Sequence, residues 1–115
     1  MKILITGGAG FIGSNYAHYR FQHHAEDEIV VLDKLTYAGN LDNLAGLKDE
    51  RRFKFMEGDI VDKDFLEDLF QKEKFDLVIN FAAETHVDRS ITGPSIFVMT
   101  NVIGTQNLLE ASRNN

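Results

Sequence analysis

A glycine-rich segment near the start of the chain holds the first residues whose type and spacing could do chemistry. Residues 7–13 read GGAGFIG, so Gly8, Gly10 and Gly13 have the spacing G-x-G-x-x-G. Gly7 or Gly8 would allow a tight turn, Gly10 would let the backbone approach a pyrophosphate, and Gly13 would bring a helix close to the preceding strand. The free amides at that helix N-terminus would face the phosphates. The segment predicts a dinucleotide loop, and the alternative is a glycine-rich turn that binds nothing.

An acidic residue at a matching distance supports a dinucleotide. Asp33 lies 20 residues after Gly13, at the end of an apolar run, where a carboxylate would bind ribose hydroxyls. That carboxylate would repel a 2′-phosphate, so NAD is favoured over NADP, and the neighbouring Lys34 weakens this preference without reversing it. Asp59 follows another strand, where a loop would pass the adenine ring. Taken alone, Asp33 and Asp59 could each be an ordinary turn residue.

Several other chemistries are not supported by the sequence. The chain has no cysteine and no G-x-S-x-G motif, and the glycine loop lacks the lysine of a phosphate-transferring loop. No spacing of histidines and carboxylates suggests a metal site. We therefore expect no cysteine, serine-hydrolase or phosphate-transferring chemistry and no metal ligand in this chain.

The elements that must position these residues alternate between two periodicities. Short apolar or β-branched runs predict strands, and 3.6-residue patterns predict helices. The expected strands cover residues 2–6, 28–32, 53–57 and 75–82, and the expected helices cover 11–24, 62–72 and 94–113. This alternation predicts an α/β fold with a doubly wound parallel sheet of the Rossmann type. The strand order 3-2-1-4 is then expected from this fold class and is not read from the residues.

Two finer expectations concern the helices. Asp62 would cap the second helix. In the last helix, Asn101 and Gly104 would share one face with Leu108, so Gly104 would permit close packing against the sheet. Asn101 would then be a buried framework residue with hydrogen-bond partners.

Composition and charge limit the possible partners. The chain has 115 residues, a net charge of −6 and a pI near 5.1. An acidic chain offers no electrostatic footprint for nucleic acid or an anionic membrane. The absence of cysteine suits a reducing compartment, so a cytoplasmic location is expected. With only four strands, and an apolar edge left on the fourth, we expect residues 1–115 to be the N-terminal part of a Rossmann domain whose remaining strands and substrate domain lie elsewhere.

Three motifs resemble a known family. Residues 6–13, TGGAGFIG, resemble the opening of the extended short-chain dehydrogenases/reductases. Residues 33–41, DKLTYAGNL, and 82–91, AAETHVDRSI, are more specific and closely resemble the dTDP-glucose 4,6-dehydratases. The likeness runs over essentially the whole chain. One departure is Thr85, where the family usually has serine, and it retains the hydroxyl.

The resemblance implies residue roles. NAD would be the cofactor, and Thr85 would also contact the sugar substrate. The residues expected at the cofactor are Gly7, Gly10, Phe11, Ile12, Gly13, Asp33, Lys34, Leu35, Thr36, Ala38, Gly39, Asp59, Ile60, Phe81, Ala82, Ala83, Glu84, Thr85 and Thr100.

The resemblance also implies a reaction. In the family, dTDP-glucose becomes dTDP-4-keto-6-deoxyglucose and water through oxidation at C4, elimination across C5–C6 and hydride return to C6. The tyrosine–lysine and aspartate–glutamate groups that catalyse it are not among these 115 residues, so the chain alone is expected to be inactive, and the full-length protein is expected to be a homodimer. A sister nucleotide-sugar 4-epimerase and a non-catalytic dinucleotide-binding module are the alternatives.

Overall fold

The computed structural model describes residues 1–35, 39–47, 51–82, 95 and 98–115. Its strands are β1 (Lys2–Thr6), β2 (Glu28–Asp33), β3 (Phe53–Glu57) and β4 (Leu77–Asn80). Its α-helices are α1 (Phe11–His23), α2 (Lys63–Glu73) and α5 (Thr105–Asn114). A short 3-10 helix, η1 (Leu41–Leu44), follows β2, and a π-helical segment, η2 (Met99–Gly104), precedes α5.

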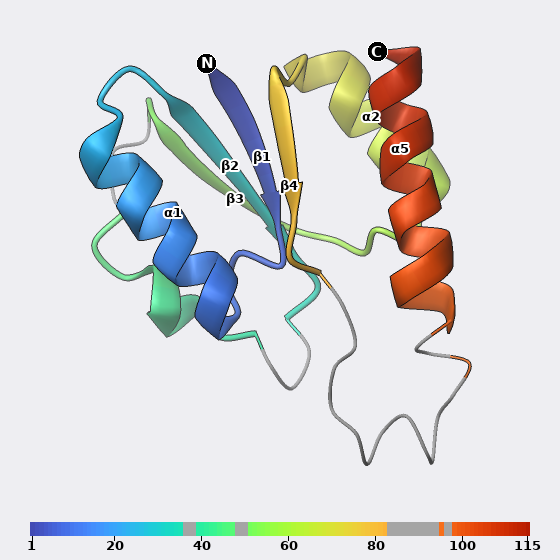
Figure 1. Cartoon of the computed structure of the whole chain (residues 1–115), viewed down its shortest axis with the longest axis horizontal. Helices are drawn as coiled ribbons and strands as arrows, with labels where there is room; N and C mark the ends of the chain where they lie inside the picture. The colour runs from blue at the N-terminus through green and yellow to red at the C-terminus, as the bar shows by residue number, and fades with distance from the viewer. Residues whose placement is uncertain (36–38, 48–50, 83–94, 96–97) are drawn as a thin grey trace.

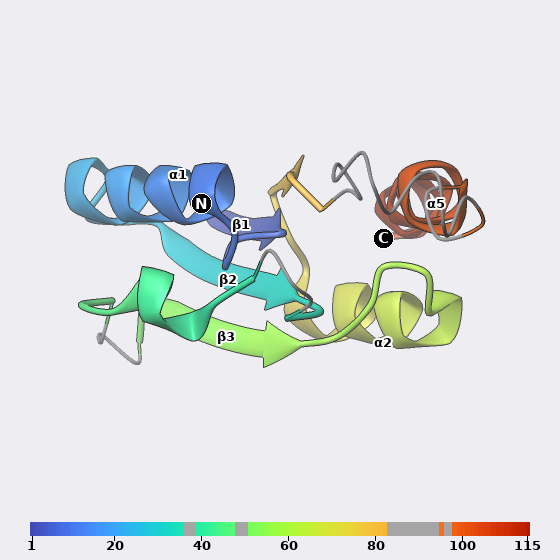
Figure 2. The ribbon, with the colours of Figure 1, turned by 90° about the horizontal axis from the view of Figure 1, so that it is seen from below.

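The four strands form one parallel sheet in the order β3-β2-β1-β4 (Figure 1). In the register, Ile3 of β1 lies opposite Ile29 of β2 and Leu77 of β4. Figure 2 shows β3, β2 and β1 stacked one above another. The predicted doubly wound α/β sheet and its strand order are confirmed. Because all strands are parallel, their carboxyl ends meet at one edge of the sheet, and the glycine loop follows β1 at that edge.

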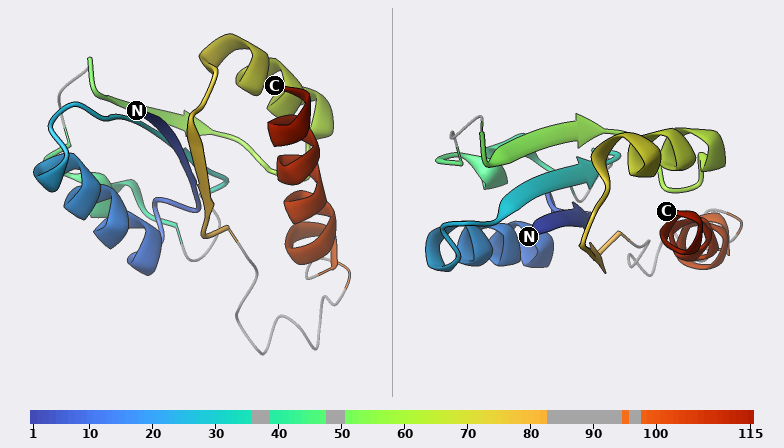
Figure 3. Two further views of the ribbon diagram at one scale, coloured as in Figure 1. Left: turned by 45° about the horizontal axis from the view of Figure 1, so that its top comes forward. Right: turned by 90° about the horizontal axis from the view of Figure 1, so that it is seen from above.

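Alternate residues of the central strands feed two hydrophobic cores. Ile3 and Ile5 point to the side covered by α1 and η1, whereas Leu4 points to the side covered by α2 and α5. All three are completely buried. Figure 1 shows α1 on one side of the sheet and α2 and α5 on the other, and Figure 3 shows α2 and α5 side by side. The strands read as continuous apolar runs because both faces are covered.

Helix α2 begins where the sequence predicts. The Asp62 carboxylate accepts a hydrogen bond from the Phe65 N–H at 3.2 Å, which supplies a partner for one of the first-turn amides. At the other end, Lys74 adopts a left-handed conformation with φ 54° and its N–H donates to the Phe70 carbonyl, which ends the helix.

Strand β4 is shorter than expected, and side chains as well as backbone groups form the hydrogen bonds at its ends. The expected strand covered residues 75–82, whereas the observed one is Leu77–Asn80. Before it, the Asp76 carboxylate accepts from the Lys2 N–H at 2.7 Å. After it, the Ala82 N–H donates to the Asn80 side chain at 3.0 Å. Leu77 remains 36% exposed at this edge of the sheet.

The last helix also departs from the expectation of one continuous α-helix. Residues 99–104 are π-helical before α5 starts. Asn101 is exposed, so its predicted burial is wrong. The buried amide is instead that of Asn107, which donates to the carbonyls of Ile60 and Val61, both at 3.0 Å. Extra residues in a π-helical turn rotate the residues before it away from an ideal α-helical face.

No helix within the described ranges is both long enough and apolar enough to cross a membrane.

Candidate functional site

The turn after β1 depends on Gly7. This residue has φ +69°, and its N–H donates to the Leu32 carbonyl of β2 at 2.8 Å. A Cβ on Gly7 would lie 2.6 Å from the backbone of Phe81 and Ala82, after β4. A Cβ on Gly8 would instead meet the Val31 side chain at 2.6 Å. The sequence left the tight turn to either glycine, and the positive φ of Gly7 places it there.

Helix α1 presents its N-terminus next to this turn. Gly10 is the N-cap and supplies no side chain to the first-turn amides, which have no partner within the helix. A Cβ on Gly13 would clash with the Gly7 carbonyl oxygen and lie 2.9 Å from Gly8 Cα. Phe11 and Ile12 are 81% and 66% exposed. The helix end therefore offers amides and positive dipole to an anion at an accessible place.

Asp33 is joined to the glycine loop. Its Oδ2 accepts from the Ala9 N–H at 2.9 Å and its Oδ1 accepts from the Leu35 N–H at 2.7 Å. The residue is 9% exposed. Each carboxylate oxygen has a second lone pair beyond these bonds. The carboxylate can thus accept further hydrogen bonds from ribose hydroxyls while it holds the loop against β2.

The backbone beside Asp33 is in a sparsely populated conformation. Leu35 has φ +58°, which is uncommon for a residue other than glycine. A Cβ on Gly39 would lie 2.8 Å from Asp33 Oδ1 and 3.2 Å from Leu35 Cα. The absence of a side chain at Gly39 lets the chain return close to the Asp33 carboxylate, and the Asp33–Leu35 hydrogen bond holds the strained turn.

Two asparagines hold the Ala9 carbonyl in place, and the sequence did not predict these contacts. The Ala9 carbonyl accepts from the Asn40 N–H at 3.0 Å and from Asn43 Nδ2 at 2.8 Å. The His18 ring contacts the Asn43 carbonyl at 2.8 Å. The Asn40 side-chain oxygen caps η1 by accepting a hydrogen bond from the Asp42 backbone N–H. The sequence could have predicted that Asn40 caps a helix, because asparagine is a common N-cap residue. No local sequence pattern predicts the hydrogen bond from Asn43 to Ala9, which lies 34 residues away.

Lys34 and Asp59 form an ion pair at the ends of β2 and β3. Lys34 Nζ lies 3.2 Å from Asp59 Oδ2, and the side chains are 50% and 33% exposed. Asp59 Oδ1 accepts from the Val61 N–H at 3.0 Å. The Gly58 N–H donates to the Asp33 carbonyl at 3.0 Å, so this loop lies directly beside the Asp33 backbone.

Ile60 lies differently from its neighbour Asp59. Its side chain is 3% exposed in the core of the α2 and α5 side. A Cβ on Gly104 would lie 2.5 Å from Ile60 Cδ1. The predicted close packing at Gly104 is therefore made against this loop. Any contact of Ile60 with a ligand at the sheet edge would be through its backbone.

The end of β4 lies against the glycine turn. Phe81 is half-buried, and its ring lies 5.7 Å from that of Tyr16 in α1. The fully buried Thr6 hydroxyl donates to Asn80 Oδ1, which also accepts from the Ala82 N–H. Sequence reasoning missed this bond between β1 and β4.

The remaining predicted site residues are placed only in part. Thr100 is half-buried in η2. The helix that continues from η2 approaches the end of β4, because Asn80 Nδ2 lies 3.5 Å from Thr105 Oγ1. The predicted site residues outside the described ranges are Thr36, Ala38, Ala83, Glu84 and Thr85.

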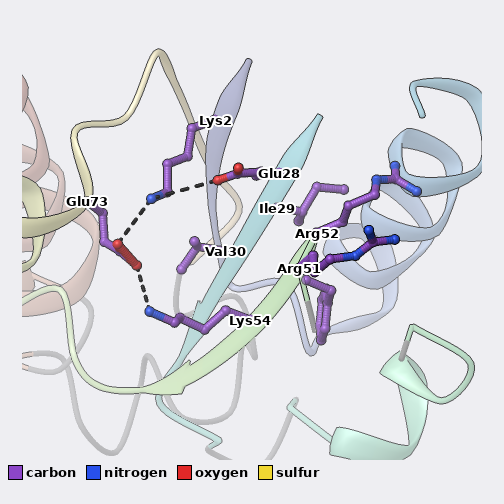
Figure 4. Close-up of a pocket in the computed structure, with 9 residues that line it drawn as sticks. Lys2, Glu28, Ile29, Val30, Arg51, Arg52, Lys54 and Glu73 are labelled. Carbon is purple, nitrogen blue, oxygen red and sulfur yellow. Dashed lines mark hydrogen bonds and ion pairs between the residues drawn. The ribbon is translucent and has the colours of Figure 1, made fainter. Parts of the chain in front are cut away.

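A cavity at the amino ends of the strands lies away from this site (Figure 4). Glu73, at the end of α2, binds Lys2 at 3.1 Å and Lys54 at 2.8 Å. The hydrogen bond from Lys54 is the main reason that the pKa of Glu73 lies below its usual value. Arg52 donates to the carbonyl oxygens of Phe21 and His24 at the end of α1. These charges fasten helices to the sheet.

The glycine turn, the α1 N-terminus and the Asp33 carboxylate lie together at the carboxyl edge of the sheet. This arrangement suits an extended ligand with phosphates. Comparison with known families gives a match over residues 4–115 to a family described as GDP-mannose 4,6 dehydratase. The chain belongs to that family. Its α/β sheet, with the glycine turn after β1, is the Rossmann-type fold of the dehydratases and epimerases to which it is similar.

Curated relatives share about half of the residues. The low-salt glycan biosynthesis protein Agl12 of Haloferax volcanii is 54% identical over 112 residues, which are 97% of this chain and 35% of that protein. A dTDP-glucose 4,6-dehydratase of Shigella flexneri is 51% identical over 114 residues, 99% of this chain and 31% of that protein. The resemblance to dTDP-glucose 4,6-dehydratases is confirmed. The chain spans about a third of the length of these relatives.

Solved structures agree with this assignment. A dTDP-glucose 4,6-dehydratase from Streptomyces venezuelae, solved with NAD bound, has a TM-score of 0.88 at 46% identity and covers 99% of this chain and 36% of that one. A UDP-Glc/GlcNAc 4-epimerase from Campylobacter jejuni has a TM-score of 0.87 at 39% identity, over 98% of this chain and 33% of that one.

Proposed function

We propose that this chain is the NAD-binding part of a nucleotide-sugar dehydratase that converts dTDP-glucose to dTDP-4-keto-6-deoxyglucose and water. The observation that carries the proposal is the bond between the Asp33 carboxylate and the Ala9 N–H of the glycine loop. This bond puts a ribose-binding carboxylate beside the amides of the α1 N-terminus, as a dinucleotide requires. The 51% sequence identity to a dTDP-glucose 4,6-dehydratase supports this particular reaction.

The residues of this chain would bind and orient the cofactor. The Phe11 and Ile12 amides would face the pyrophosphate, and Asp33 would accept from the ribose hydroxyls. Thr100 and the residues after β4 would lie on the nicotinamide side. NAD bound here would take a hydride from C4 of the sugar and return it to C6. We propose that Thr85 contacts the sugar.

The tyrosine–lysine pair that the resemblance leads us to expect for proton transfer is not found in this chain. None of its three tyrosines has a lysine four residues later. We propose that the catalytic groups belong to the rest of the full-length protein, and that residues 1–115 alone bind the cofactor without turnover. The reaction order is consistent with acid–base chemistry, because oxidation at C4 acidifies the C5 proton that a base must remove.

A 4-epimerase is the second candidate, because the Campylobacter jejuni 4-epimerase has nearly the same fold over this region. The dehydratase is favoured by its higher identities. Incubation of the full-length protein with dTDP-glucose separates the two. A dehydratase forms a 4-keto-6-deoxy product, which absorbs in alkali, whereas an epimerase gives a C4 epimer of unchanged mass.

We also propose that the full-length protein is a cytoplasmic homodimer. The last helix supports the dimer, because it carries large apolar side chains that are exposed in this chain. Val98, Val102 and Leu109 are 55%, 58% and 66% exposed along the continuous helical stretch of residues 98–114. The cysteine-free sequence is consistent with a reducing compartment.

The cofactor site is tested by Asp33→Ala in the full-length protein. Losing hydrogen bonds from hydroxyls to a charged group costs about 1.5–3 kcal/mol, so NAD affinity should fall by roughly 10- to 150-fold. Glu57→Ala is a matched control, because Glu57 is an exposed carboxylate that lies opposite Asp33 in the strand register. NAD content after purification and titration calorimetry are the measurements, with the melting temperature as a check of folding. Unchanged NAD content in Asp33→Ala would show that the ribose assignment is wrong.

A further inference from the structure

The ion pair between Lys34 and Asp59 has a position that bears on which dinucleotide binds. Lys34 directly follows Asp33, whose carboxylate faces the proposed ribose site. In Rossmann-type sites a basic residue near the ribose accommodates the 2′-phosphate that distinguishes NADP from NAD. Lys34 is a basic residue in this position, because it directly follows Asp33. Its ammonium, however, lies 3.2 Å from Asp59 Oδ2, on the β3 side.

Asp59 is well placed to hold this lysine. Its other oxygen accepts from the Val61 N–H at 3.0 Å, which fixes the carboxylate within its own turn. The preceding Gly58 N–H donates to the Asp33 carbonyl at 3.0 Å, which fixes that turn against the end of β2. Below it, Asn107 donates to the Ile60 carbonyl at 3.0 Å. A lysine side chain has a flexible four-carbon stem, whereas this aspartate is held by its own turn, so the aspartate determines where the pair lies.

We propose that Asp59 is a specificity-determining residue for the cofactor. It keeps the Lys34 ammonium paired on the β3 side. The Lys34 charge is thereby withheld from NADP although the residue adjoins the ribose site. This inference rests on the proposed NAD site and adds the reason why a lysine beside Asp33 does not reverse the preference for NAD.

The test measures the dissociation constants of NAD and NADP for the full-length protein and its Asp59→Asn variant, by calorimetry or by competition against bound NAD. Both cofactors share the adenine and its ribose ring, so any direct contact of Asp59 with adenine changes both constants alike. Only the ratio of the NADP constant to the NAD constant reports the release of Lys34. Since the pair is partly exposed, the ratio should fall by about two- to fivefold.

Further variants assign that change to the lysine. In Asp59→Asn combined with Lys34→Gln, the ratio should return at least to the wild-type value. Glu57→Gln, which removes a nearby exposed charge, should leave it unchanged. Asp59→Ala repeats the test with a different side chain, and melting temperatures show that the variants fold.

The outcomes separate the proposed NAD-binding function from the proposed role of Asp59 in cofactor specificity. If the wild-type protein binds no NAD, the proposed function fails. If it binds NAD and the ratio stays the same in both Asp59 variants, or remains lowered without Lys34, the inference is overturned. Loss of both cofactors in the folded Asp59 variants also overturns it, because Asp59 would then act mainly by a direct contact.

Discussion

Replacing Gly13 by alanine tests the packing that shapes the glycine loop. A Cβ at this position would clash with the Gly7 carbonyl oxygen and lie 2.9 Å from Gly8 Cα and 3.0 Å from the Gly7 carbonyl carbon. All of these are backbone atoms. The turn cannot move aside easily, because the Gly7 N–H is bonded to the Leu32 carbonyl of β2.

Two opposing effects set the size of the change. Gly13 lies inside α1, where alanine is favoured over glycine by about 1 kcal/mol. Overpacking a close contact costs about 1–3 kcal/mol, and contacts with fixed backbone fall at the upper end of that range. We therefore expect Gly13→Ala to lower the free energy of unfolding by about 2 kcal/mol, a sign opposite to the one that helix propensity predicts.

The assay is urea unfolding of the full-length protein, together with its NAD content after purification. Gly46→Ala is the matched control. Gly46 has φ +95°, and among the described residues other than its two chain neighbours no atom lies within 4 Å of an added Cβ, so we expect the substitution to cost mainly backbone strain of about 1 kcal/mol. Gly13→Ala should also lose NAD, because displacing Gly7 moves the loop, whereas Gly46→Ala should retain it. A Gly13→Ala protein as stable as the wild type, with normal NAD content, would refute the steric argument.

Two further predictions concern the framework. Asn107→Ala should lower the free energy of unfolding by about 2 kcal/mol in urea titrations, because two loop carbonyls lose their donor; the exposed Asn114→Ala should change it little, and equal effects would contradict the assignment. Asp27 gives a pH dependence. Burial raises the pKa of its carboxyl, but hydrogen bonds from Arg20 and the N-terminal ammonium outweigh burial and place the pKa below its usual value. The folded state then holds this proton less tightly than the unfolded state, so the stabilisation is complete above pH about 4 and is lost as the pH falls through the lower folded pKa. The melting temperature should thus fall more steeply between pH 5 and 3 in the wild type than in Asp27→Asn, and equal slopes would count against the role of this pair.

The sequence by itself determined which segments form the central strands and helices, and where the glycine loop lies. The apolar runs of the central strands, the glycine spacing and the 20-residue step from Gly13 to Asp33 are local patterns. Such patterns follow from backbone sterics and from periodicity, so they can be read without knowing which distant residues meet. The cap at Asp62 belongs to the same class.

Tertiary contacts decided the rest of the site. Which glycine makes the turn depends on the approach of residues 81 and 82 to Gly7. Asn107, and not Asn101, is buried because the π-helical residues before α5 change the helical phase. The Lys34–Asp59 pair and the Asn43–Ala9 bond join residues 25 and 34 positions apart. These features depend on how β2, β3 and η1 meet at one edge of the sheet, and no local propensity encodes that meeting.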